Sequence, residues 1–190
     1  MKRFVKPLAL LALISLPLVA WAVVKPIRVI APELLGVSCF GQVCVEDPSR
    51  LNEARALYEE AVRYVDTKVD RMERHPRAVF CSTDACASAF GLVKPAAAHS
   101  VATIGIVLGP RGWRFYFVRH ELIHQLQSER LGSLQCWLFK PTWFREGMAY
   151  SLSGDPRRPL PQPLEGQRAE FEVWLGKVGR AHLWEEAGRL

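Results

Sequence analysis

The spacing of apolar residues along the chain predicts a mixture of helices and short strands. From Leu51 to Met72 apolar residues recur at steps of three and four, which is the period of an amphipathic helix. Asp47 stands in the capping position before this segment and Pro48 suits the first helical position, while His75 and Pro76 end it. One long helix is therefore expected in this part of the chain.

Two runs with the composition of β-strands follow that helix. RAVFCS, residues 77–82, and VATIGIVLG, residues 101–109, are mostly apolar and suit short buried strands. Between them, residues 83–91 predict a short helix that stops at a glycine, and residues 94–100 predict a loop. This part of the chain therefore supplies strands for a sheet.

Helical patterns dominate the second half of the chain. Residues 113–131 and 142–153 each predict a helix that ends at a glycine, and a last helix is expected from Glu165 into the tail. Closely spaced prolines exclude a helix from residues 155–163, because proline lacks an amide donor and restricts its neighbours. Residues 23–47, punctuated by Pro and Gly, predict an extended entry segment. The whole pattern is that of an α+β protein.

The first 22 residues have the features of an export signal. A basic front precedes an apolar run that ends in small residues at Ala20 and Ala22. We expect residues 1–22 to be a signal peptide, or an uncleaved anchor, since the apolar run approaches the length of a short spanning helix. Residues 23–190 then have a length suited to a single domain with its own core.

The charge of the chain gives no sign of nucleic-acid binding. Without residues 1–22 the chain carries 22 Lys and Arg against 19 Asp and Glu, a net charge of +3. The sequence then contains no basic run and no RNA-binding signature. We therefore expect no nucleic-acid partner.

The five cysteines agree with an oxidising compartment. Cys39 and Cys44 have the same spacing as Cys81 and Cys86, so two local disulfides and one free thiol, Cys136, are the simplest arrangement. A metal site built from four thiolates is the alternative, but a C-x4-C spacing is wider than zinc fingers normally use. The spacing therefore favours disulfides and an exported protein.

The segment RHELIHQ, residues 119–125, carries the candidate chemistry. His120 and His124 are four residues apart in a predicted helix and project from the same face. Two imidazoles placed in this way can bind one Zn²⁺ at about 2.0–2.1 Å. Glu121 beside them can accept a proton from a water molecule that attacks a carbonyl, which is the chemistry of H-E-x-x-H. A histidine pair that only forms hydrogen bonds at the surface is the simpler alternative.

A zinc site needs a third protein ligand, and several residues are candidates. The extended motif H-E-x-x-H-x-x-G-x-x-H is not present, because Gln127 and Arg130 stand where Gly and the third His belong. Cys136 offers a thiolate, and Glu129 is turned away from the histidine face. Glu146 is the better candidate, because it lies on the next predicted helix, after a segment long enough to bring that helix back antiparallel.

The surroundings of Glu146 favour a bound cation. Trp143 and Phe144 precede it, and the small residues Gly147 and Ala149 follow it, so that another helix can approach closely. A carboxylate in so apolar a segment needs a partner to stay charged, and a cation bound by two histidines would be one. An ion pair with a basic residue such as the adjacent arginine, or plain exposure to solvent, is the alternative.

RHELIHQ followed by WFREGMAY resembles the gluzincin branch of the zinc metallopeptidases, in which H-E-x-x-H is followed by a helix with an E-G-x-A-type motif that donates a glutamate. The resemblance covers about residues 113–153 and the strand before them. It implies a zincin-like α+β fold, in which a small mixed sheet packs against an active-site helix and several further helices. It also implies His120, His124 and Glu146 as zinc ligands and Glu121 as the general base.

The chain departs from thermolysin-like members at Tyr150, where an Asp often stands, so no carboxylate is identified that would orient a ligand histidine. Tyr150, Tyr116 and His99 are candidates for stabilising the oxyanion of the transition state, which needs a donor besides zinc. Residues 101–109 lie where zincins have the edge strand that pairs with an extended peptide. A buried central strand fits the same residues equally well.

Together these features predict an exported zinc peptidase, periplasmic or extracellular, that hydrolyses a peptide or protein substrate. Membrane contact is expected only if residues 1–22 remain as an anchor. Two alternatives share the same residues, namely a non-catalytic zincin-like binding module of the cell envelope and a zinc amidase that acts on cell-wall material. The sequence does not indicate the substrate, the cleavage preference or the oligomeric state.

Overall fold

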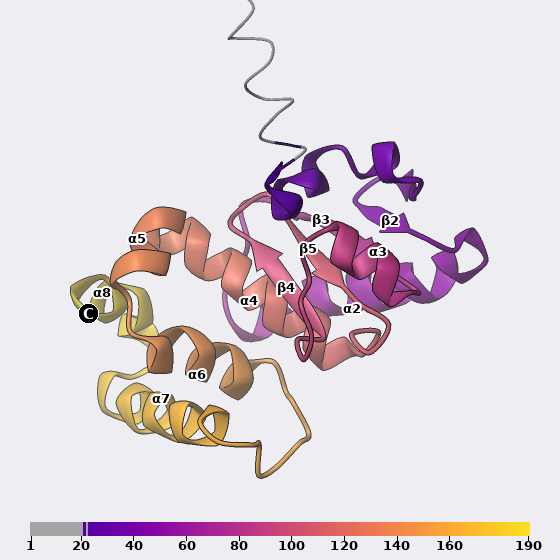
Figure 1. Cartoon of the computed structure of the whole chain (residues 1–190). Helices are drawn as coiled ribbons and strands as arrows, with labels where there is room; N and C mark the ends of the chain where they lie inside the picture. The colour runs from indigo at the N-terminus through magenta and orange to yellow at the C-terminus, as the bar shows by residue number, and fades with distance from the viewer. Residues whose placement is uncertain (1–20, 22) are drawn as a thin grey trace, which may run out of the picture.

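The computed structural model describes residues 21 and 23–190 (Figure 1), so the predicted signal or anchor, residues 1–22, lies outside the described residues except for Trp21. The strands are β1 (Ser38–Phe40), β2 (Val43–Val45), β3 (Arg77–Phe80), β4 (Ala98–Val101) and β5 (Gly105–Leu108). The α-helices are α2 (Leu51–Lys68), α3 (Asp84–Ala89), α4 (Phe115–Leu131), α5 (Ser133–Phe139), α6 (Thr142–Leu152), α7 (Leu164–Val178) and α8 (Leu183–Arg189). Four short 3₁₀ segments are η1 (Lys25–Ile30), η2 (Pro32–Leu35), η3 (Pro48–Arg50) and η4 (Arg180–His182).

The strands form one mixed sheet in the order β1-β2-β3-β5-β4. The three inner strands run parallel, whereas β1 and β4, at the two edges, are antiparallel to their neighbours. Helices pack against both faces of the sheet. They also form most of the second half of the chain (Figure 1). The α+β class predicted from the sequence is confirmed.

The inner strands are apolar on both faces because both faces of the sheet are covered. One face of β3 and β5 contributes Phe80, Ile106 and Leu108 to a core shared with α2, α4 and α6. The other face contributes Val79 and Val107 to a smaller core shared with η1 and α3. The continuous apolar runs in the sequence therefore reflect burial on two sides.

The first long helix is shorter than predicted. Asp47 accepts a hydrogen bond from the Ser49 amide at 2.9 Å, which confirms the predicted cap, but α2 ends at Lys68 and does not continue to His75. Asp66 accepts the Met72 amide at 2.9 Å, which turns the chain after α2 so that Met72 still reaches the core. The periodic pattern continued beyond the helix because Val69 and Met72 of the following loop also pack on the core.

The run 101–109 is not one strand. Its first residue ends β4, a turn follows in which the Ile104 amide donates to the Val101 carbonyl at 2.9 Å, and β5 begins at Gly105. A Cβ at Gly105 would lie 2.2 Å from a Val29 methyl and 2.7 Å from the Arg77 carbonyl oxygen, so the hairpin needs glycine there. The predicted loop at 94–100 therefore contains most of the edge strand.

The entry segment is folded rather than extended. Residues 25–35 form η1 and η2, and a hairpin of β1 and β2 follows. A disulfide between Cys39 and Cys44 joins these two strands. Short 3₁₀ turns begun by prolines have no apolar period, which is why the sequence pattern did not predict them.

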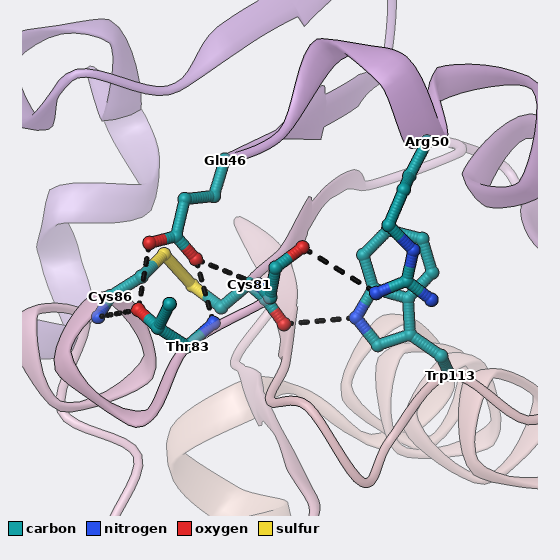
Figure 2. Close-up of a disulfide and its surroundings, with 7 residues drawn as sticks. Glu46, Arg50, Cys81, Thr83, Cys86 and Trp113 are labelled. Carbon is teal, nitrogen blue, oxygen red and sulfur yellow. Dashed lines mark hydrogen bonds between the residues drawn. A yellow bond between two sulfur atoms is a disulfide. The ribbon is translucent and has the colours of Figure 1, made fainter.

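The second predicted disulfide, between Cys81 and Cys86, joins the end of β3 to α3 (Figure 2). Beside it, the Glu46 carboxylate accepts hydrogen bonds from the Ser82 and Thr83 amides at 2.7 and 2.8 Å. The Trp113 indole donates to the Cys81 carbonyl at 2.9 Å, which ties this corner to the chain just before α4. Two disulfides of this kind are typical of an oxidising compartment, as the sequence predicted.

The helices of the second half include one that the sequence did not predict. α5 occupies residues that were expected to be a loop, and four of its seven residues are large, apolar and exposed, namely Leu134, Trp137, Leu138 and Phe139. α6 follows within the predicted bounds and packs along α7 (Figure 1). The proline-rich stretch 155–163 contains no helix, as predicted. In the part of the chain that the structure describes, no helix has the length and apolarity needed to cross a membrane.

Arg119 holds α4 against two other helices. Its guanidinium forms an ion pair with Glu60 of α2 and donates at 3.2 Å to the carbonyl of Ser153, just after α6. The same group lies 3.7 Å from the ring centroid of Tyr64. The side chain next to His120 therefore secures the position of the helix that carries the motif.

Gly147 allows α6 and α7 to approach closely. A methyl group added at this position is therefore expected to destabilise the fold. A Cβ at Gly147 would lie 2.2 Å from the Gln167 carbonyl oxygen and 2.7 Å from the Phe171 Cβ. We expect Gly147→Ala to lower the free energy of unfolding by about 1–3 kcal/mol through overpacking, measured by urea denaturation.

Gly176→Ala is the matched control, because a Cβ on this α7 residue meets no atom within 4 Å. It should raise the free energy of unfolding by about 0.5–1 kcal/mol, since alanine is the better helix former. Equal effects of the two substitutions would contradict the close packing at Gly147.

Candidate metal centre

Helix α4 has a buried polar face in addition to its apolar face. Leu122 and Leu126 are fully buried in the main core. On another side of the helix, His120 is 7% exposed, Glu121 5% and Gln127 1%. Buried polar groups are stable only with partners, so this face of α4 must be matched by other polar groups.

Donor atoms of three residues converge at this face. The Nε2 atoms of His120 and His124 lie 3.1 Å apart. Oε2 of Glu146 lies 3.6 Å from Nε2 of His120, and Oε1 lies 3.6 Å from Nε2 of His124. The structure therefore brings together the three residues predicted as ligands, from α4 and α6.

These separations fit a tetrahedral metal ion. Two donors that are each bound at 2.0–2.1 Å in tetrahedral geometry lie about 3.4 Å from each other, close to the three observed distances. Two imidazoles and one carboxylate are also a donor set that zinc commonly has in catalytic sites, where one position stays open. His120, His124 and Glu146 could therefore hold a metal ion.

Cys136 lines the same cavity as a free thiol but does not belong to this group, and the other acidic candidates are placed elsewhere or lie beside a disulfide. Glu129 accepts hydrogen bonds from the Glu73 and Arg74 amides at 3.0 and 3.2 Å, which confirms that it is turned away from the histidines. Glu46 forms a second acidic and sulfur-containing group with Cys81 and Cys86, but those sulfurs are joined in a disulfide. Among the described residues, His120, His124 and Glu146 form the group whose donor atoms are free for a metal.

The pKa values of Glu146 and His124 show that positive charge is favoured between them. Burial would raise the pKa of Glu146, but hydrogen bonds and charge from the two imidazoles outweigh it and hold that pKa well below its ordinary value. Burial would likewise lower the pKa of His124, but Glu146 above all raises it to about 9. A divalent cation at the same point would supply the positive charge in place of a proton.

Glu121 lies in the same cavity as the three donors and is almost completely buried. Burial raises the pKa of its carboxyl above the ordinary value, and this effect exceeds the opposing attraction of the two histidines. The backbone N–H of Ser100 in β4 is a hydrogen-bond donor to this carboxylate. A buried carboxylate with a raised pKa is suited to accept and return a proton.

Gln127 orients one of the candidate ligands, a role that the sequence did not reveal. Its side-chain oxygen lies 2.9 Å from Nδ1 of His124, and its amide nitrogen donates to the Arg145 carbonyl at 2.9 Å. The oxygen can only accept, so Nδ1 carries the proton and Nε2 is left free as a ligand. The three-residue spacing from His124, which places Gln127 on the same helical face, is the signal that could have identified it.

The three predicted oxyanion donors are in different positions. Tyr150 lines the cavity and packs against the His120 ring with centroids 4.4 Å apart. Burial raises the pKa of Tyr150 to about 12, so its hydroxyl keeps its proton and can donate. Tyr116 does not line the cavity and contacts Phe115, Phe117 and Arg157. Of the two tyrosines, Tyr150 alone is placed at the donors.

His99 also belongs to the cavity wall, in the edge strand β4. Its cross-strand partner is Val107, which belongs to the core opposite α4, so alternation along the strand turns its ring away from the three candidate ligands. Burial lowers the pKa of His99, and its Nε2 atom has no hydrogen-bond partner in the structure. The ring is therefore not placed as a donor to the site.

The free edge of β4 lies beside α4 and forms one wall of the cavity. The Ala97 carbonyl accepts from the Gly109 amide at 2.9 Å, and His99 pairs with Val107, so the backbone groups of Ala98 and Ser100 point away from β5. The edge position predicted for the run 101–109 is therefore occupied mainly by residues 98–100. The larger part of that run, β5, is an inner strand.

The cavity between these elements has a volume of about 440 Å³. Its walls come from β4 and the preceding loop, from α4, from α5 and from α6. This size is within the usual range for a site that binds a small ligand or a few residues of a peptide. The three candidate ligands therefore line a space that a small ligand can enter.

Comparison of the chain with protein-family models, with curated proteins and with solved structures finds no match.

Gln127→Ala tests whether this residue orients His124. Loss of the hydrogen bond to Nδ1 should weaken zinc affinity by about 10–100-fold, measured by competition with a chromogenic chelator. Gln127→Glu keeps an acceptor for Nδ1 and should bind zinc more tightly than the alanine variant.

Gln135→Ala, on exposed α5, is the control and should leave zinc affinity unchanged. If Gln127→Ala bound zinc as tightly as this control, Gln127 would have no orienting role.

Proposed function

We propose that this protein is a zinc-dependent peptidase of the gluzincin type, with His120, His124 and Glu146 as metal ligands and Glu121 as the general base. The observation that carries the proposal is the convergence of His120, His124 and Glu146, which offer one ligand atom each within 4.8 Å of one another, next to a buried carboxylate in the same cavity. The resemblance of both sequence motifs to gluzincins supports the same assignment.

Zinc, when bound, would polarise the carbonyl of the scissile bond and make a water molecule easier to deprotonate. Glu121 accepts the proton of that water as its oxygen attacks the carbonyl carbon. Glu121 then returns the proton to the leaving amine as the C–N bond breaks, so the carboxylate is regenerated. The raised pKa of Glu121, which results from burial, makes its carboxylate a stronger base for the first transfer.

Tyr150 is the residue that we assign to the oxyanion of the transition state. Its hydroxyl is protonated at neutral pH, and the residue lines the cavity from the helix that also carries Glu146. A donor held by packing needs little reorganisation during the reaction, which is the basis of transition-state stabilisation by a preorganised group. The contact with the His120 ring holds the tyrosine close to the metal ligands.

The substrate would bind in extended form along β4. The outward backbone groups of Ala98 can pair with a peptide by adding a strand to the sheet edge. Such pairing does not depend on side chains, so it would align many sequences across the site. It would also bring the peptide beside Glu121, which the Ser100 amide links to the same strand.

The two disulfides agree with action outside the cytoplasm. We therefore include export to the periplasm or to the extracellular space in the proposal. The substrate is then a peptide or protein of that compartment, or the peptide part of a cell-wall polymer.

Glu121→Gln separates the chemistry from metal binding. Glutamine has the same shape but cannot accept the proton, so hydrolysis of a fluorogenic peptide library should fall by about 10²–10⁴-fold. Zinc content, measured by mass spectrometry of the metal, should stay at one ion per chain because Glu121 is not a ligand. Glu129→Gln, on the same helix but turned away from the cavity, should remain active.

Full hydrolysis by a zinc-loaded Glu121→Gln protein would contradict this mechanism. One bound zinc with no hydrolysis by the wild-type protein would instead favour a binding module of the cell envelope. Hydrolysis of cell-wall amides but not of peptides would favour the amidase.

Tyr150→Phe tests the assigned oxyanion donor. Loss of the hydroxyl should lower kcat by about 10²-fold, with little change in KM, because the lost interaction forms only in the transition state. Tyr116→Phe is the matched control outside the cavity and should retain kcat within about twofold, since surface changes away from the site have small effects. Equal kcat values for the two variants would contradict the assignment.

A further inference from the structure

Arg145 brings a positive charge into the cavity without a matching group from its own chain. It lines the cavity next to Glu146 in α6, and its Nε atom is buried without a hydrogen-bond partner. None of the ion pairs formed by the described residues includes its guanidinium. Other arginines near the site are paired, as Arg119 is with Glu60 and Arg157 with Asp155.

The ion pair between Arg145 and Glu146, which the sequence left open as an alternative, does not form. Glu146 is directed to the two histidines, although its neighbour in sequence is basic. The backbone carbonyl of Arg145 is held by Gln127, whereas its side chain stays available. A buried polar atom without a partner is uncommon in folded proteins and calls for an explanation.

The surroundings of Arg145 place it on the α5 side of the cavity. The charge of Arg145 affects the buried Cys136 thiol, so the two side chains are neighbours. Cys136 and Trp137 line the same cavity, and Trp137 is 69% exposed. This wall therefore combines a cation with an apolar aromatic surface.

The charges of the cavity indicate what this cation would bind. The acidic residues that line the cavity are Glu121 and Glu146, and both are placed around the metal position. A divalent cation would balance these two carboxylates, which leaves the charge of Arg145 unmatched. A carboxylate is the natural partner, since a guanidinium can donate two parallel hydrogen bonds to it.

We propose that the Arg145 guanidinium binds a carboxylate of the substrate, so that the site prefers peptides with a free C-terminus or an acidic side chain close to the scissile bond. This inference rests on the proposed peptidase function, because it places a substrate across the same cavity. Arg145 thereby determines specificity, while Glu121 and the metal ligands determine the reaction.

Binding is measured with zinc-loaded Glu121→Gln protein, so that the result does not depend on hydrolysis. The probes are pools of N-acetylated tetrapeptides built from neutral residues, prepared with a free C-terminal carboxylate and as the C-terminal amide. A second pair of amidated pools carries either one Glu or one Gln at each position. Equilibrium dialysis with mass spectrometry gives the ratio of bound carboxylate peptide to bound neutral peptide.

We expect a ratio of about tenfold or more in at least one pair of pools, as for one charge-assisted interaction. The first pair reports a terminal carboxylate and the second an acidic side chain. Arg145→Gln, added to the same protein, should reduce the ratio to about one, while Arg145→Lys should keep part of it because the charge remains. Arg63→Gln removes the same charge from an exposed position of α2 and should leave the ratio unchanged.

A carboxylate bound by zinc instead of Arg145 would keep its advantage in the Arg145→Gln protein, and that result would overturn the inference. Equal binding of carboxylate and neutral peptides by the Glu121→Gln protein with Arg145 intact would also overturn it. Zinc content and thermal unfolding of each variant show whether the fold and the neighbouring ligand Glu146 are intact. If Arg145→Gln loses its fold or its zinc, Arg145→Lys is compared with Arg63→Gln instead. Equal ratios of bound carboxylate peptide to bound neutral peptide in these two variants would reject the inference.

The proposed function and this inference fail in different ways. Cleavage of all four pools at equal rates by the wild-type protein would support the peptidase and reject the role of Arg145. A carboxylate preference in binding that depends on Arg145, together with no cleavage by the wild-type protein, would keep the inference about the cavity and reject the peptidase.

Discussion

The convergence of two imidazoles and one carboxylate is the interaction on which the site depends. His120, His124 and Glu146 come from two helices, and their partly or fully buried side chains converge within one cavity. Burial of a carboxylate is unfavourable unless positive charge accompanies it. The low pKa of Glu146 and the raised pKa of His124 both result from this need for positive charge beside the carboxylate. A divalent cation supplies that charge without protonation of a histidine.

Packing outside the site sets this geometry. Arg119 fixes α4 to α2 and to the end of α6, and Gln127 links His124 to the backbone of α6. Gly147, next to Glu146, lets α7 support α6 from its other side. Small shifts of α6 would move the carboxylate relative to both histidines, so these contacts help to set the geometry of the site.

Local sequence patterns predicted the candidate ligands. The role of Gln127, the position of the edge strand and the helix α5 depend on tertiary contacts, and the sequence did not predict them. His120 and His124 were predictable because helical spacing places them on one face, and Glu146 because a carboxylate in an apolar segment of the next helix needs a partner. Gln127 was taken only as a departure from a longer motif, since its role depends on the approach of α6. The edge strand was misplaced because the apolar run 101–109 hides a turn that requires Gly105 against Val29. The exposed apolar residues of α5 lack the usual period of a buried face, so that helix was not predicted.

The most direct test of this account is anomalous diffraction at the zinc absorption edge from crystals of the purified protein. The account predicts one zinc peak bonded to Nε2 of His120, Nε2 of His124 and a carboxylate oxygen of Glu146, each at about 2.0–2.2 Å. A structure in which zinc-soaked crystals show no peak there, with the Glu146 carboxylate directed away from both histidines, would contradict it.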